Sequence, residues 1–391
     1  MKPKSSVDDL GLFFEPWHED VARRAAEVAA AWTPALDADE REATRAAAKA
    51  LAAAGLLAYC VPEAFGGAAV GRAEQLDARA LTLIREALGQ ADGLLDTAFA
   101  MQGLGTYAIT LAGSDAQKAR YLPGTMQGER LGAFCLTEPE AGSDVASMRC
   151  HARRVADGYV IDGEKVFISN AGVAGQYVLF ATVDPSLGRR GITAFVVEPD
   201  DAGLAIEPIE VIAPHPIGRL RFDGCVIPAE RRLGAEGEGF ALAMATLDVF
   251  RTTVGGAALG MARRALDEAI DRALARRQFG RPIFDQQQVA AYLADSATEL
   301  DAARLLVFRA AWLRDTRAGR VSAEVAMGKL FATEAAQRII DRAVQIHGGL
   351  GVTRGSVPER LYREVRALRI YEGTSEIQRV VIAAGLRAGR S

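Results

Sequence analysis

Cysteine and histidine are scarce in this chain, with four of each among 391 residues. The cysteines have no paired spacing, so we expect reduced, mostly buried thiols and not a disulfide framework. No two histidines stand at a spacing that would place metal ligands on one face of a helix, which argues against a zinc or iron site. A nucleophile elbow and a P-loop lysine are also missing, so neither of these motifs indicates the chemistry.

Neither sign of charge dominates, and no apolar run is long. Lys and Arg number 46 against 50 Asp and Glu, and the formal net charge of -4 gives no reason to expect a nucleic-acid partner. No uninterrupted apolar segment is long enough to span a membrane, and the residues after Met1 do not form the apolar core of a signal peptide. We therefore expect a cytoplasmic protein with neither a nucleic acid nor a membrane as partner.

Helical periodicity is present in the first third of the chain and in its last part. From Glu15 to about Gln127 the sequence is rich in alanine, and apolar residues recur at intervals of three and four. From Phe240 onward the same pattern returns in longer repeats. These repeats predict helices at about 241–276, 287–318 and 322–346.

The region between these helical parts has the pattern of a sheet. From Leu131 to about Leu233, short runs of β-branched and aromatic residues alternate with turn residues. Asp157-Gly158 and Asp162-Gly163 are predicted to form tight turns, so we expect a small antiparallel β domain. The fold class is therefore α+β, mostly α. The predicted domains are a helical domain at 1–130, a β domain at 131–239 and a second helical domain at 240–391.

Glu372 stands out in the stretch Arg369–Arg379, between Tyr371 and Gly373. It follows an apolar-periodic run, so it would lie at a helix end, where glycine lets the backbone approach a ligand closely. A carboxylate surrounded by apolar groups and an aromatic ring has its pKa raised, toward the range in which it can remove a weakly acidic proton. Glu372 is therefore a candidate general base, with a solvated turn residue as the alternative reading.

Two segments of the β region carry hydroxyl groups beside glycine or an aromatic residue. In the segment 135–144, Thr137 and Ser143 could bond the edge of a flat heteroaromatic ring. In the segment 167–170, Phe167 could stack on such a ring, and the hydroxyl of Ser169 follows two residues later. Each segment alone is a weak signal for a ring-shaped ligand.

Together with the glycine-rich segment 345–351 and the Glu372 stretch, these motifs resemble those of the acyl-CoA dehydrogenase family. The resemblance covers nearly the whole chain, with the motifs in the family's order and at its separations. It implies an acyl-CoA dehydrogenase-like fold, with an N-terminal helical domain, a middle antiparallel β-barrel-like domain and a C-terminal four-helix-bundle domain. It also implies FAD as the cofactor and an acyl-CoA as the substrate.

The resemblance also assigns site residues. Thr137 and Ser169 would bond the flavin, and Arg276 would bind the pyrophosphate of the FAD in a neighbouring subunit, which implies a homotetramer or a dimer. Substrate-binding positions are Ser143, Asp248, Arg251 and Gly373. The full set of implied cofactor-binding positions is Phe134, Leu136, Thr137, Gly142, Ser143, Phe167, Ser169, Arg276, Gln278, Phe279, Gln287, Gln345, Gly348, Gly349, Thr374 and Glu376.

The implied reaction is the α,β-dehydrogenation of an acyl-CoA thioester to the 2,3-enoyl-CoA. Glu372 would remove the α-proton while the β-hydride passes to the flavin. In the family, a flavin ribityl hydroxyl and the backbone N–H of the catalytic glutamate stabilise the enolate charge on the thioester carbonyl. An electron-transfer flavoprotein is the implied electron acceptor.

Some positions depart from the family pattern. Phe250 occupies the only other position at which family members carry the base, and it cannot accept a proton. Phe167 stands where the family usually has Trp, and the segment 211–220 replaces the common Met-Gly-x-Arg-x-Ser pattern. The small residues at 255–258 predict room for a branched, cyclic or medium-length acyl group. A flavin-dependent oxidase or monooxygenase on the same fold, and a helical scaffold that has lost its flavin, remain as alternatives.

Overall fold

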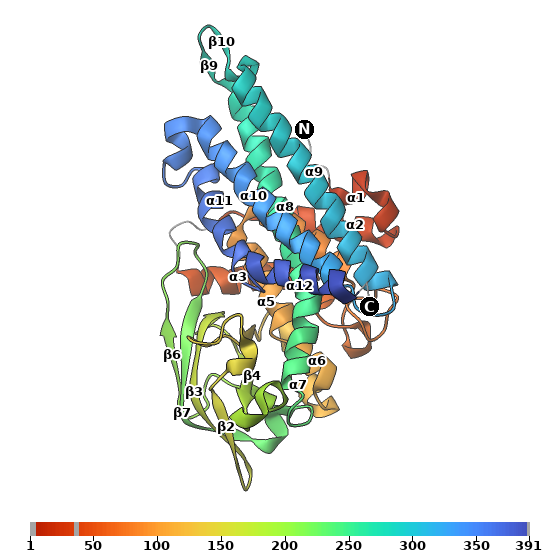
Figure 1. Cartoon of the computed structure of the whole chain (residues 1–391), viewed down its shortest axis with the longest axis vertical. Helices are drawn as coiled ribbons and strands as arrows, with labels where there is room; N and C mark the ends of the chain where they lie inside the picture. The colour runs from red at the N-terminus through yellow and green to blue at the C-terminus, as the bar shows by residue number, and fades with distance from the viewer. Residues whose placement is uncertain (1–4, 35–38, 389–391) are drawn as a thin grey trace. The chain divides into compact units, whose positions relative to one another are not determined.

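The computed structural model describes residues 5–34 and 39–388. The chain forms two compact units that interleave along the sequence (Figure 1). Unit 1 contains Met1–Leu36, Ala78–Asp96 and Arg251–Ser391, and unit 2 contains Asp37–Asp77 and Thr97–Phe250. The predicted order of helices, sheet and helices is confirmed, whereas the three domain boundaries stay a prediction.

Unit 1 consists mainly of helices, three of which are long. α9 and α10 pack against each other, and α12 packs on α10. The three long helices begin and end within two residues of their predicted bounds, because apolar periodicity sustained over many turns is a strong helix signal. The helices are α1 (Ser6–Asp9), α2 (Trp17–Ala31), α4 (Ala78–Ala91), α8 (Gly239–Ala275, which begins in unit 2), α9 (Gln287–Thr316), α10 (Ser322–His347), α11 (Val357–Val365) and α12 (Ser375–Ala388).

Helix α8 packs against its neighbours in unit 1 through glycine. A Cβ atom at Gly256 would lie 2.4 Å from the carbonyl oxygen of Thr82, and one at Gly260 would lie 2.1 Å from that of Glu86. Both oxygens belong to α4, so the two helices touch at their backbones. The core around this contact is formed by buried aliphatic side chains of α8, α9 and α10. This close packing fixes α8 and α4 relative to each other.

Unit 2 begins with helices and continues into the sheet. Helix α7 starts with a capping box, in which Ser114 and Gln117 satisfy each other's backbone N–H groups. The helices are α3 (Glu40–Ala53), α5 (Gly93–Leu104, which begins in unit 1), α6 (Tyr107–Ala112) and α7 (Asp115–Met126). No helix in the described ranges is long and apolar enough to cross a membrane.

The sheet of unit 2 has eight strands in the order β6-β7-β3-β2-β4-β5-β8, with β1 paired to β4. The long strands of this sheet are β3 and β7, which span 12 residues each and pair with each other (Figure 1). The sheet is antiparallel except where β4 pairs with β1 and with the first residue of β2. The strands are β1 (Gly132–Cys135), β2 (His151–Val155), β3 (Gly158–Ser169), β4 (Gln176–Thr182), β5 (Ile192–Val197), β6 (Leu204–Pro208), β7 (Ile217–Pro228) and β8 (Arg232–Leu233).

One of the two predicted turns is wrong. Asp157 and Gly158 do lie where β2 turns into β3, but Asp162 and Gly163 lie inside β3. The pairing of β3 with β7 shifts register between Ile161 and Gly163, which marks a β-bulge. A glycine inside a strand pattern is a signal for a bulge as well as for a turn, and here the long pairing with β7 decides between them.

Candidate active site

Glu372 lies in the short loop between α11 and α12. The 3₁₀ turn Arg366–Arg369 follows α11, and the backbone then turns through left-handed conformations at Glu372 (φ 53°) and Gly373 (φ 93°) before α12 begins. A left-handed glutamate is rare and costs about 1 kcal/mol or more, so the surrounding structure must hold it in place. The sequence reading that placed Glu372 at a helix end beside a conformationally permissive glycine is confirmed.

The carboxyl group of Glu372 is buried although the residue as a whole is partly accessible. Within the described part of the chain, its Oε2 atom has no hydrogen-bond partner. Burial raises the pKa of this carboxyl above its ordinary value, while the positive charges of Arg85, Lys329 and Arg251 act in the opposite direction. A carboxylate with an unpaired, buried oxygen and a raised pKa has the properties of a general base.

Three donors bond the backbone carbonyls around Glu372. Lys329 Nζ donates to the carbonyl oxygens of Tyr371 (3.2 Å) and Gly373 (2.9 Å). Arg251 Nε donates to the carbonyl oxygen of Glu372 (3.0 Å). Gln378 Nε2 donates to the carbonyl oxygen of Gly373 (2.8 Å), so helices α8, α10 and α12 each contribute one side chain to the loop. These bonds stabilise the left-handed turn.

A buried ion pair lies close to the same loop. Arg85 on α4 and Asp96 on α5 form two parallel hydrogen bonds of 2.7 and 2.8 Å, and Arg85 also donates to Thr253 Oγ1 (3.0 Å). The guanidinium acts on the loop electrostatically. Burial raises the pKa of the Tyr371 hydroxyl well above its usual range, and the positive charge of Arg85 opposes that rise.

In unit 2, the segment after β1 is held by a second buried ion pair. Lys165 Nζ lies 2.6 Å from a carboxylate oxygen of Glu138 and also donates to the carbonyl oxygen of Leu136 (3.0 Å). The carboxylate of Glu138 accepts further bonds from the backbone N–H groups of Arg149 and Cys150. Because Glu138 follows Thr137 directly, this pair fixes the backbone of the predicted flavin-binding segment.

Leu136 is buried, whereas the other predicted positions of this segment lie at or near the surface. Gly142 and Ser143 are exposed, Thr137 is half-buried, and no atom comes within 4 Å of a Cβ built on Gly142. Phe134 is half-buried, and its ring packs on Phe180 with a centroid distance of 5.0 Å. The loop is thus accessible to a ligand while its backbone is fixed from beneath.

The end of β3 carries the second predicted segment. Phe167 is 59% exposed and has a left-handed φ of 56°. Ser169 is half-buried, with its Oγ atom 3.5 Å from His215 Nε2. His215 lies in the segment 211–220, its Nδ1 atom is 3.2 Å from the carbonyl oxygen of Ala213, and burial lowers its pKa. The unusual segment therefore places an imidazole with a lowered pKa beside Ser169.

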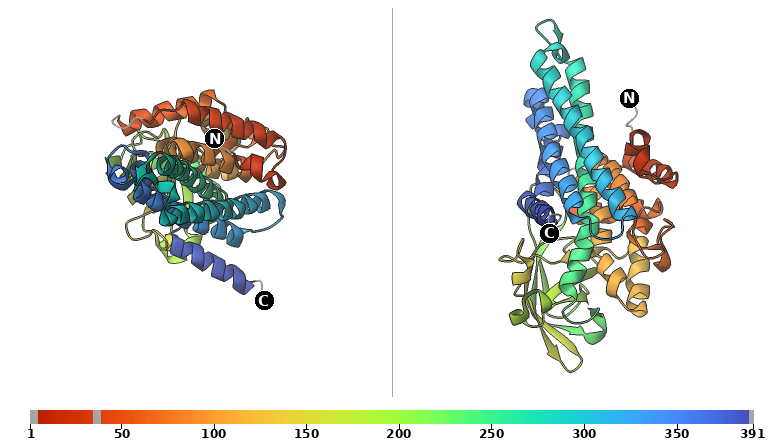
Figure 2. Two further views of the ribbon diagram at one scale, coloured as in Figure 1. Left: turned by 90° about the horizontal axis from the view of Figure 1, so that it is seen from above. Right: turned by 45° about the vertical axis from the view of Figure 1, so that its right-hand side comes forward.

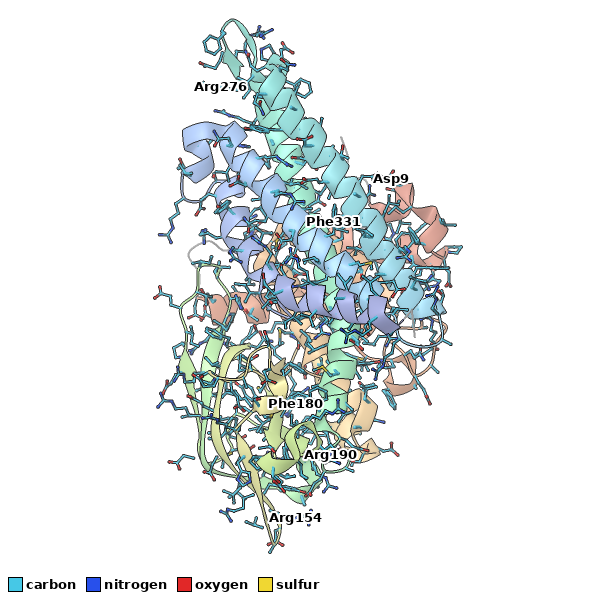
Figure 3. The ribbon with its side chains drawn as sticks, viewed as in Figure 1. Asp9, Arg154, Phe180, Arg190, Arg276 and Phe331 are labelled. Carbon is cyan, nitrogen blue, oxygen red and sulfur yellow. The ribbon has the colours of Figure 1, made fainter. Side chains whose placement is uncertain are left out.

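Arg276 lies at the C-terminal end of α8, at the base of the β-hairpin formed by β9 (Arg277–Gln278) and β10 (Arg281–Pro282) (Figure 3). Phe279 at the tip is 93% exposed and has a φ of 51°. Arg276, Gln278 and Gln287 are also exposed. Within unit 1, the hairpin lies far from α12 along α8 and α9, in both Figure 1 and Figure 2. One copy of unit 1 therefore does not bring the hairpin to Glu372.

The remaining predicted cofactor positions belong to two segments of unit 1. Gln345, Gly348 and Gly349 are exposed at the end of α10. Thr374 and Glu376 are at the start of α12, where Thr374 Oγ1 accepts a bond from the N–H of Ile377. These residues lie on the surface of unit 1, and their part in cofactor binding stays a prediction.

Helix α8 carries the substrate-binding candidates Asp248 and Arg251. Phe250 is buried and packs edge-on against Tyr107, so this position holds an apolar contact and no base. The predicted acyl space at 255–258 is wrong. Gly255 faces Val307 of α9, with only 2.6 Å available to a Cβ, and Gly256 faces the backbone of α4. Neighbouring helices fill the space that the small residues leave.

Sequence reasoning missed several charged residues that support the site. The clearest are Lys329, Arg85 with Asp96, and Glu138 with Lys165. Each of these five side chains is buried, and Lys329 lies on the apolar stripe of α10. A charged residue on an apolar helical stripe is a usable signal, since such a residue is rarely fully buried without a partner. The sequence could have marked the residue but not its partner.

Four described residues other than glycine have left-handed φ angles: Phe167, Asn170, Phe279 and Glu372. Phe167, Phe279 and Glu372 are positions that the sequence reading assigned to the cofactor or the base. Backbone strain of this kind concentrates at functional sites. Two exposed, strained phenylalanine rings would be costly on a free surface, whereas each could cover the flat ring or the chain of a bound dinucleotide. The residues present therefore fit FAD.

Models of three protein domains match the chain in order. The acyl-CoA dehydrogenase N-terminal domain matches residues 15–129, the middle domain residues 133–225 and the C-terminal domain residues 237–387. An acyl-CoA dehydrogenase of Bacillus subtilis is 39% identical over 339 residues, which cover 86% of this chain and 88% of the relative. A 3-(aryl)acrylate reductase of Clostridium sporogenes is 37% identical over 384 residues, covering 96% of this chain and all (100%) of the relative.

Solved structures of similar chains superpose over most of the molecule. Butyryl-CoA dehydrogenase from Megasphaera elsdenii is 32% identical, with a TM-score of 0.86 over 95% of this chain and 98% of that chain. The prolyl acyl carrier protein oxidase AnaB is 29% identical, with a TM-score of 0.87 over 95% of this chain and 99% of that chain. PigA with FAD and proline is 28% identical, with a TM-score of 0.85 over 95% of this chain and 98% of that chain.

Proposed function

Because the chain belongs to the acyl-CoA dehydrogenase family, we propose that it oxidises an acyl-CoA thioester to the 2,3-enoyl-CoA. The observation that carries this proposal is the environment of Glu372. Its carboxyl group is buried, one of its oxygens has no hydrogen-bond partner in the described residues, and its pKa is raised. An α-proton next to a thioester is only weakly acidic, so its removal needs a base of this kind.

FAD is the cofactor of this chain, as it is of the family. When bound, it supplies the acceptor for the β-hydride. The residues that would hold it are Thr137, Phe167 and Ser169 in unit 2, with Arg276 and Phe279 of the hairpin binding the cofactor of another subunit. The separation of the hairpin from the Glu372 loop within unit 1 supports this sharing. We therefore include a homotetramer or a dimer in the proposal.

The chain's own part in the reaction is to position a proton acceptor and to stabilise negative charge. Glu372 accepts the α-proton on its carboxylate, and the buried, water-poor surroundings keep that carboxylate reactive. The backbone N–H of Glu372 is the proposed donor to the thioester carbonyl, where enolate charge develops. Arg85, Lys329 and Arg251 favour the ionised form of Glu372 before the proton is transferred.

The second candidate function differs from the first in its electron acceptor or in the direction of the reaction. The similarity to AnaB, an oxidase, supports a flavin-dependent oxidase on this fold, and the similarity to a 3-(aryl)acrylate reductase supports the reverse direction. A base at Glu372 serves α,β-dehydrogenation, whereas an oxygenase without α-proton removal would not use it. We therefore propose an electron-transfer flavoprotein as acceptor and keep the oxidase as the alternative.

A panel of saturated acyl-CoAs tests the proposal. The purified, FAD-loaded protein is mixed anaerobically with linear, branched, cyclic and aryl acyl-CoAs, and bleaching of the flavin absorbance is followed. We expect rapid bleaching by one class and formation of the matching enoyl-CoA. Reoxidation is then compared with electron-transfer flavoprotein and with oxygen. No bleaching by any acyl-CoA would remove the dehydrogenase function, and fast reoxidation by oxygen with peroxide release would favour the oxidase.

A further inference from the structure

Lys329 is a buried lysine in the middle of α10, with 1% of its surface exposed. Among residues 5–34 and 39–388, its ammonium group has no close ion-pair partner. Instead it donates to two backbone carbonyls, those of Tyr371 and Gly373, at 3.2 and 2.9 Å. Burying an ammonium group is costly unless its donors are satisfied, so these two bonds are what compensates for burial.

The two carbonyls that Lys329 holds stand on either side of Glu372. The carbonyl between them, that of Glu372 itself, accepts from Arg251 (3.0 Å). Three successive carbonyls are therefore held by cationic side chains from α10 and α8. Gln378 adds a neutral donor to the carbonyl of Gly373 (2.8 Å).

The geometry of the peptide group between Tyr371 and Glu372 lets a hydrogen bond to its carbonyl set the direction of its N–H group. No described peptide bond is cis, and in a planar trans peptide the C=O and N–H groups point in opposite directions. The carbonyl of Tyr371 and the N–H of Glu372 belong to the same peptide plane. When Lys329 holds that carbonyl on one side of the loop, the N–H of Glu372 must point to the other side. Lys329 thus sets the direction of the N–H group without touching it.

We propose that Lys329 is a positioning residue for Glu372, which aims both its backbone N–H and its carboxylate by holding the carbonyls on either side. The inference rests on the proposed function, in which Glu372 is the base and its N–H stabilises the thioester enolate. Because a charged donor gives a shorter and stronger hydrogen bond than a neutral one, the ammonium form holds the loop more tightly than the amine form does.

The electrostatic surroundings of Lys329 support this role. Burial lowers the pKa of the ammonium group to about 8, against the opposing effect of the negative charge of Glu372. The other charged groups that face Lys329 are Arg251 on α8, Glu334 on α10 and Glu376 on α12. Lys329 is therefore mostly charged below about pH 8 and holds the two carbonyls strongly there. Above that pH it loses its charge and the two hydrogen bonds weaken. This pH dependence distinguishes a positioning role from a purely structural one.

The test uses Lys329→Met and Lys329→Gln in the full-length, FAD-loaded protein. The methionine variant keeps the length of the side chain and removes both charge and donors. The glutamine variant keeps a neutral donor and serves if the methionine variant does not fold. The matched control is Arg304→Met, which removes another buried cation of unit 1. Arg304 bonds Ser6 (2.9 Å) and Asp9 (3.1 Å), and none of its hydrogen bonds within the described residues is to the Glu372 loop.

Three measurements separate positioning from folding. Hydrogen exchange of the backbone amides at 370–376 reports the order of the loop and needs no substrate. The infrared stretch of a bound enoyl-CoA labelled with ¹³C at its carbonyl reports the hydrogen bond from the Glu372 N–H. The pH profile of flavin reduction by the saturated acyl-CoA reports the charge of Lys329.

We expect four changes in the Lys329 variants and none of them in the control. The loop amides exchange at least about 10-fold faster, and the carbonyl stretch moves back toward its value in water. Flavin reduction slows by roughly 10–100-fold with little change in substrate affinity, which is the size of effect that misplacing a catalytic group by about 1 Å produces. The fall in rate that we expect for the wild type above about pH 8, where Lys329 loses its charge, is absent from the variants.

Unchanged loop exchange and an unchanged carbonyl stretch in both Lys329 variants would overturn the inference. Equal changes in the Lys329 and Arg304 variants would do the same, since they would show a general loss of stability. Failure of the wild type to reduce its flavin with any acyl-CoA would instead overturn the proposed function. The exchange measurement would still decide whether Lys329 orders the loop.

Discussion

Arg85 and Asp96 form a buried, two-point ion pair close to the loop that carries Glu372, with N–O distances of 2.8 and 2.7 Å. Arg85 is also the charged group with the largest effect in favour of the ionised form of Glu372. The pair therefore links the stability of unit 1 to the acid strength of the proposed base.

Breaking this pair should have two measurable effects. Arg85→Met and Asp96→Asn each leave one charge buried without its partner, so we expect each to lower the free energy of unfolding by about 3–5 kcal/mol. The double variant should lose less than the sum of the two, which denaturant unfolding in a double-mutant cycle measures. Arg85→Met should also raise the pH at which half of Glu372 is ionised, because burial dominates once the cation is gone. If the losses in unfolding free energy of the two single variants added up to that of the double variant, Arg85 and Asp96 would not be coupled.

Glu372→Gln should separate binding from chemistry. The amide keeps the shape of the side chain and the backbone N–H, but it cannot accept the α-proton at any working pH. We expect flavin reduction by a saturated acyl-CoA to fall by at least ~10²–10⁴-fold, the usual range for a general base. The variant should stay yellow and still show a spectral shift with an enoyl-CoA. Glu19→Gln, which changes an exposed glutamate of α2 that has no assigned part in the site, is the control. Substantial reduction by Glu372→Gln would mean that another residue is the base.

Arg276→Ala should weaken FAD binding and assembly together. A ligand that binds only the assembled state stabilises that state. Loss of a contact to the neighbouring subunit's FAD therefore lowers both the fraction of sites that hold FAD and the fraction of chains that are assembled. Flavin content and sedimentation after dilution measure the two effects. Arg277→Ala is the control, because Arg277 lies in the same hairpin and bonds the carbonyl of Gly280. Full flavin occupancy on dilution of the Arg276 variant would contradict the bridging role.

Glu364 gives unit 1 a pH-dependent stability. Burial, followed by the negative charge of Asp92, raises the pKa of Glu364 from 4.5 to about 8, while Arg360 and Arg363 oppose the shift. A carboxyl with a raised pKa in the folded state stabilises the fold fully below its unfolded pKa. That contribution is lost as the pH rises through the folded pKa. The melting temperature should therefore fall between about pH 5 and 8, and part of this fall should be absent in Glu364→Gln.

Glu359→Gln on the same helix is the matched control for this effect. Its carboxylate pairs with Arg363 at 2.6 Å, and that pairing lowers its pKa. A carboxylate with a lowered pKa stabilises the fold above its unfolded pKa, so Glu359→Gln should lower the melting temperature near neutral pH. It should leave the decrease in melting temperature between about pH 5 and 8 unchanged. Parallel melting curves for the wild type and Glu364→Gln from pH 5 to 9 would show that Glu364 does not titrate as stated.

The sequence predicted those features that depend on local pattern. The long helices of unit 1 follow from apolar periodicity, and the position of Glu372 near a helix end follows from the periodic run before it and the glycine after it. The bulge at Gly163 was read as a turn, because pairing with a distant strand decides between the two. The partners of Lys329 could not be predicted, since they come from a loop 42 and 44 residues away whose path depends on the packing of three helices.

The space at 255–258 was misread for a similar physical reason. Small residues on a helix leave room only if no other element approaches, and sequence pattern alone does not show what lies opposite. In the structure α4 and α9 fill that room at Gly256 and Gly255. His215 was noted only as part of an unusual segment, because nothing local to it indicates that strand pairing brings it beside Ser169.

The backbone contact between α8 and α4 limits how this scaffold can be adapted to new acyl groups. A methyl group added at Gly256 or Gly260 would meet main-chain atoms, which cannot rotate away as a side chain can. Libraries that randomise these positions should therefore yield misfolded chains and not altered chain-length preference. Changes that enlarge or reduce the acyl pocket must therefore be made outside the backbone contact between α4 and α8. These two helices can be treated as a single rigid body in such designs.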